Sequence, residues 1–115
     1  MYDKNNIFAQ IISGKIPASK VYEDDKTLAF NDINPVSEIH VLVIPKGEYI
    51  NYSDFINKAS SDEIASYFTK ILDVIKILGI EDKDYKLITN KGIDAGQTIL
   101  HFHTHIIAGE SLKTL

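Results

Sequence analysis

The sequence contains no cysteine and no arginine, and the two absences narrow the chemistry that it can support. Without cysteine, this chain has no disulfide, no thiolate zinc site and no cysteine nucleophile. Without arginine, a bound phosphate must be held by lysine, imidazole, hydroxyl or backbone N–H groups, because no guanidinium fork is available. Any phosphate site in this chain therefore lacks a bidentate guanidinium donor.

Positive charge is also scarce. All twelve basic residues are lysines scattered along the chain, and the formal net charge is −4. Nucleic-acid binding needs clustered positive charge, so we expect no nucleic-acid partner. The polar first six residues lead into a short apolar stretch that is broken at Ser13-Gly14, unlike a signal peptide or a membrane anchor. We therefore expect no membrane partner and a cytoplasmic location.

The apolar residues suffice for one modest core. The chain has 115 residues, of which 44% are hydrophobic and 24% charged, so we expect a single domain over residues 1–115. Asn5 predicts the cap of a short helix that runs to about Ser13. Residues 60–63 form a capping box before a long amphipathic helix over residues 64–78, which Gly79 ends.

Short apolar and β-branched runs predict the strands. We expect them near residues 21–23, 26–32, 40–44, 86–90 and 98–108. The fold class is therefore α+β, with about five mainly antiparallel strands, one long helix packed against them and one short N-terminal helix.

Three of the four histidines, His101, His103 and His105, occupy alternate positions near the end of the chain. On a strand they would share one face, each about 6.5–7 Å from the next. The opposite face would carry residues suited to the core: Leu100, Phe102, Thr104 and Ile106. We therefore expect the three imidazoles to face a groove or solvent.

The residues alone leave three interpretations of that face open. It is a polar face without a function, or it is a metal site, because His-x-His is a ligand spacing and His40 offers a further imidazole. In the third, a neutral imidazole attacks phosphorus while its neighbours hold an oxygen or pass a proton. An unperturbed imidazole titrates near 6.5, so one neutral and one charged ring would coexist at neutral pH.

Residues 94–107, DAGQTILHFHTHII, resemble the His-x-His-x-His signature of the histidine triad superfamily. The Asp-Ala-Gly-Gln-Thr lead-in is similar to its Hint branch of nucleoside phosphoramidases. The signature itself covers residues 97–107, and the likeness extends from about residue 5 to Gly109. It includes Ile7-Phe8, Ile16-Pro17-Ala18, residues 22–25, Leu28-Ala29-Phe30, Asp32-Ile33, Pro35 and residues 40–46.

The resemblance implies a HIT-like domain and an enzyme that releases AMP or GMP from a phosphoramidate or a similar leaving group. His103 matches the nucleophile, which forms a nucleotidyl-histidine that water hydrolyses, and His105 matches a donor to a phosphate oxygen. His101 and His40 match supporting imidazoles, and Thr98 stands where the family usually has a serine near the leaving group. The resemblance implies no metal or other cofactor. We expect a neighbouring carbonyl to accept the Nδ1–H of His103 and to leave Nε2 unprotonated.

The resemblance also implies a purine nucleotide site. Asp32 matches the acceptor of the ribose hydroxyls, and Asn90, Gly96 and Gln97 match a polar shell around the phosphate. The apolar slot for the base is matched by Ile7, Phe8, Ile11, Phe30 and Ile33. On spacing alone, some of these apolar residues fit the core equally well, and Asp32 fits an ordinary turn.

Members of the branch are homodimers, which here implies contact through the helix over residues 64–78 and the strand over residues 86–90. Glu110 stands where many members have a basic residue, and the segment after Gly109 is shorter than the tail that shapes leaving-group preference in the branch, which leaves the breadth of substrates open. Two rival functions also remain: a dinucleoside polyphosphate hydrolase similar to the Fhit branch, and a non-catalytic nucleotide- or zinc-binding module.

Overall fold

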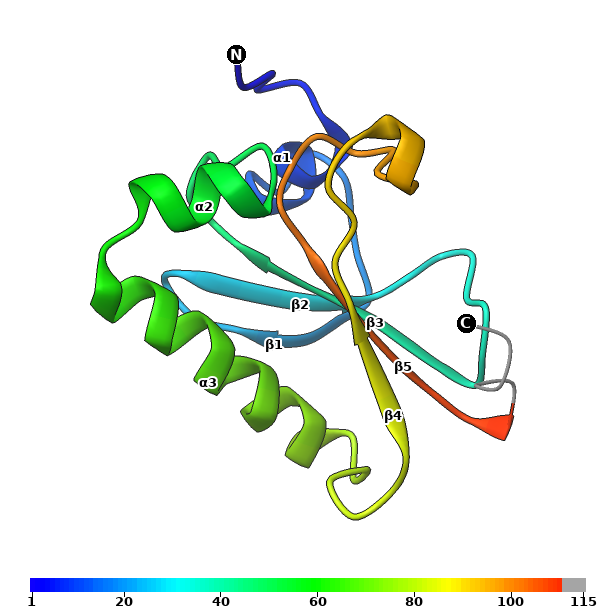
Figure 1. The fold of residues 1–115 in the computed structure, drawn as a ribbon. Coiled ribbons are helices and arrows are strands. Elements are labelled where there is room, and N and C mark those ends of the chain that lie inside the picture. The colour runs from blue at the N-terminus through cyan, green and yellow to red at the C-terminus, as the bar shows by residue number, and fades with distance from the viewer. Residues whose placement is uncertain (111–115) are drawn as a thin grey trace.

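The computed structural model describes residues 1–110, and a five-stranded sheet forms its centre (Figure 1). The strands lie in the order β1-β2-β3-β5-β4, and each neighbouring pair is antiparallel. Their bounds are β1 Lys20–Glu23, β2 Thr27–Asn31, β3 Ile39–Pro45, β4 Tyr85–Ile88 and β5 Thr104–Ala108. β3 is the middle strand, while β1 and β4 form the two edges.

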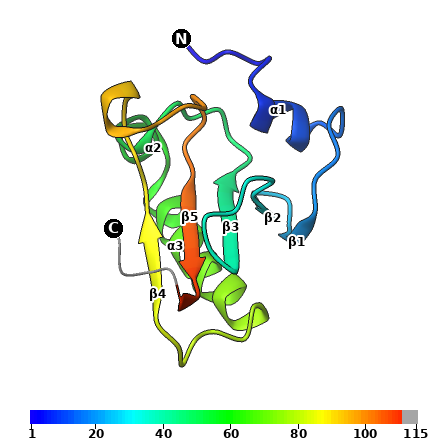
Figure 2. The ribbon, with the colours of Figure 1, turned by 90° about the vertical axis from the view of Figure 1, so that its right-hand side faces the viewer.

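Two apolar clusters cover the two faces of the sheet. The long helix α3 (Ser61–Ile77) packs on one face, behind the strands in Figure 2. The short helix α1 (Ile7–Ile12) packs on the other. Along β3, Val41 and Val43 belong to the α3 cluster, while Leu42 and Ile44 belong to the α1 cluster. This alternation explains why the run is continuously apolar: both of its faces are buried.

Side-chain caps fix the starts of the helices. The Asn6 side chain accepts from the N–H of Ala9 and caps α1, so the predicted cap at Asn5 is wrong by one residue. The Ser60 hydroxyl accepts from the N–H of Glu63 and caps α3, as the capping box predicted. α3 ends before Gly79, whose φ of 73° lies in the left-handed region that favours glycine.

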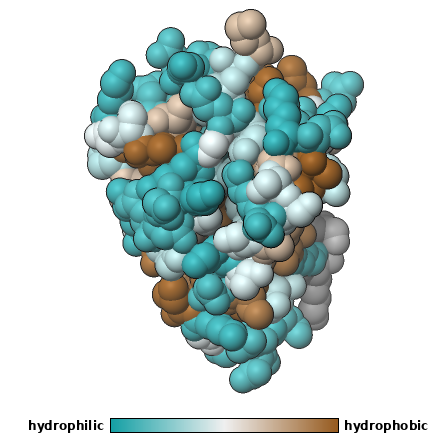
Figure 3. Space-filling model, turned by 90° about the vertical axis from the view of Figure 1, so that its left-hand side faces the viewer, coloured by the Kyte–Doolittle hydropathy of each residue, from teal (hydrophilic) through white to brown (hydrophobic). Residues whose placement is uncertain are grey.

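A further helix, α2 (Tyr52–Lys58), was not predicted. Asn51 caps it through the N–H of Asp54, and Phe55 is its one residue that is fully buried. The helix is too short for its apolar spacing to give a periodic signal. The outer surface of this helical side is largely hydrophilic with separate hydrophobic patches (Figure 3).

The predicted strand over residues 98–108 is wrong in its first half. Regular pairing begins at Thr104, opposite Val43, and residues 98–103 lie outside the sheet. β3 ends at Pro45, which has no N–H to continue the ladder. The Phe102 N–H instead donates to the Tyr49 carbonyl at 2.7 Å. Leu100, which we expected in the core, is 44% exposed.

The predicted α+β class, with five antiparallel strands, one long helix packed against them and one short N-terminal helix, is confirmed. Within residues 1–110, no helix combines the length and the apolarity needed to cross a membrane.

Candidate active site

A pocket of about 470 Å³ opens on the α1 face of the sheet. Ten of the residues that the sequence assigned to the site line it: Ile7, Phe8, Ile11, Phe30, Asp32, Ile33, His40, Thr98, His103 and His105. The structure adds eight that carried no assignment: Ile16, Pro17, Ala18, Asn31, Asn34, Val36, Leu42 and Ile99. The Ile16-Pro17-Ala18 stretch belonged to the resemblance, and that was the only signal for it.

His103 presents one nitrogen to this pocket. Its Nδ1 lies 2.6 Å from the carbonyl oxygen of His101, which can only accept, so Nδ1 carries the hydrogen. In a neutral ring Nε2 then keeps its lone pair, which agrees with the tautomer that we expected. The Phe8 ring meets the imidazole edge-on with 5.1 Å between centroids, and His103 is 7% exposed. One ring edge therefore remains reachable from the pocket.

A chain of hydrogen bonds also fixes the tautomer of His105. The N–H of Val36 donates to His40 Nδ1 at 3.2 Å, so the hydrogen of a neutral His40 sits on Nε2. His40 Nε2 lies 2.9 Å from His105 Nδ1 and donates to it. A neutral His105 then carries its own hydrogen on Nε2. The centroids of the His105 and His103 rings lie 5.0 Å apart, and both residues line the pocket.

His101 lies behind the pocket and does not line it. It has no exposed surface, so our expectation that all three imidazoles face a groove or solvent is wrong for this residue. Residues before Thr104 are not bound by the strand alternation, and the His101 ring is held inside the protein by two hydrogen bonds. Its Nε2 donates to the Pro45 carbonyl at 2.7 Å, and its Nδ1 accepts from the Tyr2 hydroxyl at 2.6 Å.

Burial favours the neutral form of all three triad imidazoles. It lowers the pKa of His101 to about 4 and lowers the pKa of His103, which the bond to the His101 carbonyl opposes. Burial, followed by repulsion from His103 and His40, lowers the pKa of His105 to about 4. The expected pairing of a neutral with a charged ring is therefore wrong for the ligand-free protein at neutral pH.

These shifts predict a loss of stability in mild acid. A histidine that titrates near 6.5 when unfolded and near 4 when folded binds more protons in the unfolded chain between those values. Stability is therefore fully present above about pH 6.5 and falls as the pH drops towards 4. For His101 we expect a loss on the order of 2 kcal/mol between pH 7 and pH 5, with His105 acting in the same direction.

Denaturant unfolding at the two pH values measures this loss, and proton NMR of the imidazoles assigns it. A His101 ring that titrates near its ordinary pKa in the folded protein would contradict the prediction.

Asp32 joins the histidines at the rim of the pocket. One carboxylate oxygen accepts from the N–H of Asn34 at 2.8 Å, which is the turn role that its sequence position also fitted. The other lies 3.4 Å from His40 Nε2. Asp32, His40 and His105 each offer a ligand atom within 4.8 Å of the others, so this group could hold a metal ion. The sequence analysis had assigned Asp32 to the ribose hydroxyls and not to a metal ion.

The three residues assigned to the phosphate shell organise the loop before the triad. The Asn90 side chain donates to the Ala95 carbonyl, and the Gln97 side chain donates to the Ile50 carbonyl. Gly96 has a φ of 95°, which favours glycine at that position. None of the three lines the pocket, so a direct contact with phosphate stays a prediction.

Comparison with known proteins agrees with the fold and the histidines. A sequence model of the family described as HIT domain matches residues 13–112. An uncharacterised HIT-like protein of Rickettsia prowazekii is 54% identical over 112 residues, which cover 97% of this chain and 93% of that protein. Two solved structures are similar along most of their length. A HIT family hydrolase from Clostridium thermocellum has a TM-score of 0.87 at 37% identity and covers 98% of this chain and 99% of its own.

The second structure is a histidine triad nucleotide-binding protein from Candida albicans, with a TM-score of 0.81 at 31% identity. It covers 90% of this chain and 73% of its own. An antiparallel sheet with an imidazole-lined pocket on one face thus defines a histidine-based, hydrolase-like protein. The chain belongs to the HIT family, which confirms the superfamily that the sequence resembled.

Proposed function

We propose that this protein is a purine nucleoside phosphoramidase, which releases a nucleoside monophosphate from a phosphorus–nitrogen bond through a covalent intermediate on His103. One observation carries the proposal. His103, whose Nε2 is unprotonated, and His105, whose Nε2 carries a hydrogen, line one pocket with 5.0 Å between their ring centroids, and hydrogen bonds fix both tautomers. A nucleophile and a donor to the developing phosphate charge therefore stand next to each other without an arginine.

The reaction runs in two displacements. The lone pair of His103 Nε2 attacks phosphorus, the P–N bond to the leaving group breaks, and the nitrogen leaves as an amine after taking a proton. Thr98 and His105, which both line the pocket, are the candidate donors of that proton. Water then attacks phosphorus and returns a proton to the donor that lost one, the P–N bond to His103 breaks, and the nucleotide and the neutral imidazole are released. The His101 carbonyl stabilises the imidazolium-like ring of the intermediate by accepting from Nδ1.

Substrate charge supports the proton transfer. In the ligand-free protein, burial lowers the pKa of His101, His103 and His105 and so favours the neutral form of these rings. A phosphate in the pocket places negative charge beside His105 and raises the pKa of this ring, while His103 attacks in its neutral form. The substrate thus brings about the protonated state that departure of an amine requires.

The remainder of the pocket fits a nucleoside. Its volume of about 470 Å³ lies within the range of small-molecule sites. The apolar residues Phe8, Ile11 and Phe30 from α1 and β2 suit the faces of a base, and the Asp32 carboxylate at the rim suits ribose hydroxyls as an acceptor. The relative from Candida albicans is named as a nucleotide-binding protein, which agrees with this assignment.

A direct rate comparison tests the proposal. Purified protein should hydrolyse a fluorogenic adenosine phosphoramidate faster than diadenosine polyphosphate, measured as kcat/KM for each. A preference for the polyphosphate would favour the rival hydrolase, because one nucleophile serves both reactions and the leaving group distinguishes them.

The Asp32, His40 and His105 group gives the metal interpretation a specific observation. Metal analysis of the same sample decides it. Stoichiometric zinc without turnover of either substrate would replace the proposed enzyme with a metal-binding module.

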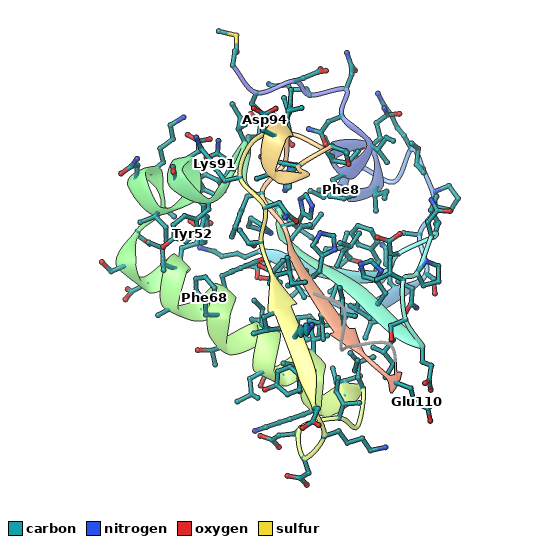
Figure 4. All side chains as sticks on the ribbon, turned by 45° about the vertical axis from the view of Figure 1, so that its right-hand side comes forward. Phe8, Tyr52, Phe68, Lys91, Asp94 and Glu110 are labelled. Atoms are coloured by element: carbon teal, nitrogen blue, oxygen red, sulfur yellow. The ribbon has the colours of Figure 1, made fainter. Side chains whose placement is uncertain are left out.

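We also propose that the protein forms a homodimer through α3 and the edge strand β4. Among the described residues, Phe68, Leu72 and Leu87 are large apolar side chains that stay exposed on these elements, and Tyr52 of α2 lies beside them. Figure 4 shows Tyr52 and Phe68 next to β4. An edge strand beside exposed apolar side chains favours pairing with a second copy.

The variant Leu87→Lys should therefore be a monomer. A lysine charge at the centre of a dimer interface would lose its hydration without gaining a partner, so we expect self-association to weaken by at least about a hundredfold. Light scattering after size exclusion measures the mass at several concentrations. Ile77→Lys is the matched control, because Ile77 is exposed on the opposite flank of α3. Equal masses of Leu87→Lys and the unaltered protein would refute this interface.

A further inference from the structure

The segment before α1 reaches the rear of the triad. The Tyr2 hydroxyl lies 2.6 Å from His101 Nδ1, and the two rings meet edge-on at 5.6 Å between centroids. The segment is itself held in place, because the backbone N–H and the side-chain amide of Asn6 both donate to the Asp3 carbonyl. Tyr2 lies before residues 13–112, which the family model matches.

The direction of this hydrogen bond follows from the partner on the other side of the ring. The Pro45 carbonyl can only accept, so His101 Nε2 carries the single hydrogen of the neutral ring. His101 Nδ1 must then accept, and the Tyr2 hydroxyl donates to it. Burial raises the pKa of the Tyr2 phenol, so the hydroxyl keeps its hydrogen at neutral pH.

His101 in turn holds the nucleophile. Its carbonyl accepts the Nδ1–H of His103, although residue 101 lies outside the strand ladder. The peptide that contains this carbonyl is fixed on its N–H side by the bond from Phe102 to the Tyr49 carbonyl. The side chain of the same residue is fixed at both ring nitrogens, by Pro45 and by Tyr2. Removing the Tyr2 bond leaves the His101 ring held at one nitrogen only, so the residue whose carbonyl orients His103 is fixed less firmly.

We propose that Tyr2 is a positioning residue for the nucleophile: its hydroxyl pins the His101 ring, and through the His101 carbonyl it keeps His103 Nε2 directed into the pocket. The expected effect of Tyr2 on the reaction rate rests on the proposed function. Its expected effect on the His101 ring rests only on the Tyr2–His101 hydrogen bond. Tyr2 does not line the pocket and so does not touch the substrate.

Tyr2 could instead serve only as packing, since its ring also covers His101. The variant Tyr2→Phe separates the two roles, because it keeps the ring contact and removes the hydroxyl. A buried acceptor is then left without a donor, which carries a definite energetic cost. Lys4→Ala is the matched control: Lys4 lies in the same segment and makes an exposed ion pair with Glu48 at 4.0 Å.

Two measurements on the 115-residue protein test the proposal. In steady-state hydrolysis of the adenosine phosphoramidate, we expect Tyr2→Phe to lower kcat about tenfold with KM unchanged, because the lost bond acts on the nucleophile and not on binding. In long-range ¹H–¹⁵N NMR of the ligand-free protein, we expect the His101 Nδ1 resonance to shift in Tyr2→Phe. Neither kcat nor that resonance should change in Lys4→Ala.

The outcomes separate this proposal from the proposed function. An unaltered kcat in Tyr2→Phe overturns the positioning role, whether or not the resonance shifts. Equal losses of kcat in both variants, in step with their melting temperatures, also overturn it, because packing alone explains them. If the unaltered protein hydrolyses no phosphoramidate, the proposed function fails, and an unchanged His101 Nδ1 resonance in Tyr2→Phe would independently reject the hydrogen bond.

Discussion

Replacement of His103 by alanine should lower phosphoramidate turnover by roughly four orders of magnitude or more, as is typical when a covalent nucleophile is removed. The reason is local. His103 Nε2 is the unprotonated nitrogen that faces the pocket. The unprotonated nitrogens of His40 and His105 are already occupied, because each accepts a hydrogen bond at Nδ1. Neither His40 nor His105 can serve as the nucleophile without turning its ring and breaking these hydrogen bonds.

Binding should survive the same substitution. The base and ribose contacts proposed for Phe30 and Asp32 do not involve His103, so calorimetry with AMP should give an affinity within about tenfold of the unaltered protein. Mass spectrometry after a rapid denaturing quench at alkaline pH, which preserves the P–N bond, provides the second measurement, because the unaltered protein should carry one nucleotidyl group during turnover and the variant should carry none. Equal rates for His103→Ala and the unaltered protein would remove His103 from the mechanism.

Phe102→Ala should destabilise the fold by about 3–5 kcal/mol, the usual cost of deleting a buried aromatic ring. Phe102 is 1% exposed and stacks on Phe55 with 4.8 Å between centroids, and Tyr67 lies 5.3 Å away. A cavity at this point leaves the aromatic cluster without its centre. Urea unfolding followed by circular dichroism measures the change.

Leu100→Ala provides the control two residues earlier in the chain. Leu100 is largely exposed, so its truncation should cost less than about 1 kcal/mol. The comparison also tests where the sheet ends, because a strand that continued through residue 100 would bury this side chain with Phe102. Similar losses for the two variants would contradict the described path of residues 98–103.

The elements that the sequence predicts well are those with local causes. The capping box at Ser60 and the helical spacing after it define α3, and the apolar run of β3 identifies a strand buried on both faces. The start of β5 has a non-local cause, since it depends on where β3 stops offering hydrogen-bond partners. The alternation of histidines continues past that point, and it therefore predicted a strand that pairing does not support.

The sequence likewise predicted some residues of the site and missed others. The histidine spacing identified the reactive face, and the resemblance assigned the pocket residues that α1 and β2 bring together. No sequence pattern linked Tyr2 to His101, which lie 99 positions apart. Gln97 was assigned to the phosphate shell, yet its amide is engaged by the Ile50 carbonyl, a contact that only the folded loop reveals.

Strand β3 positions two imidazoles of the site, and this determines how the protein should lose activity. His40 stands at one end of this strand, and the Pro45 carbonyl that holds His101 stands at the other. Strands buried on both sides exchange their amide hydrogens through opening of the whole domain. Heat or denaturant should therefore inactivate the protein in one step with global unfolding, and fraying of the edge strands should leave the arrangement of imidazoles intact.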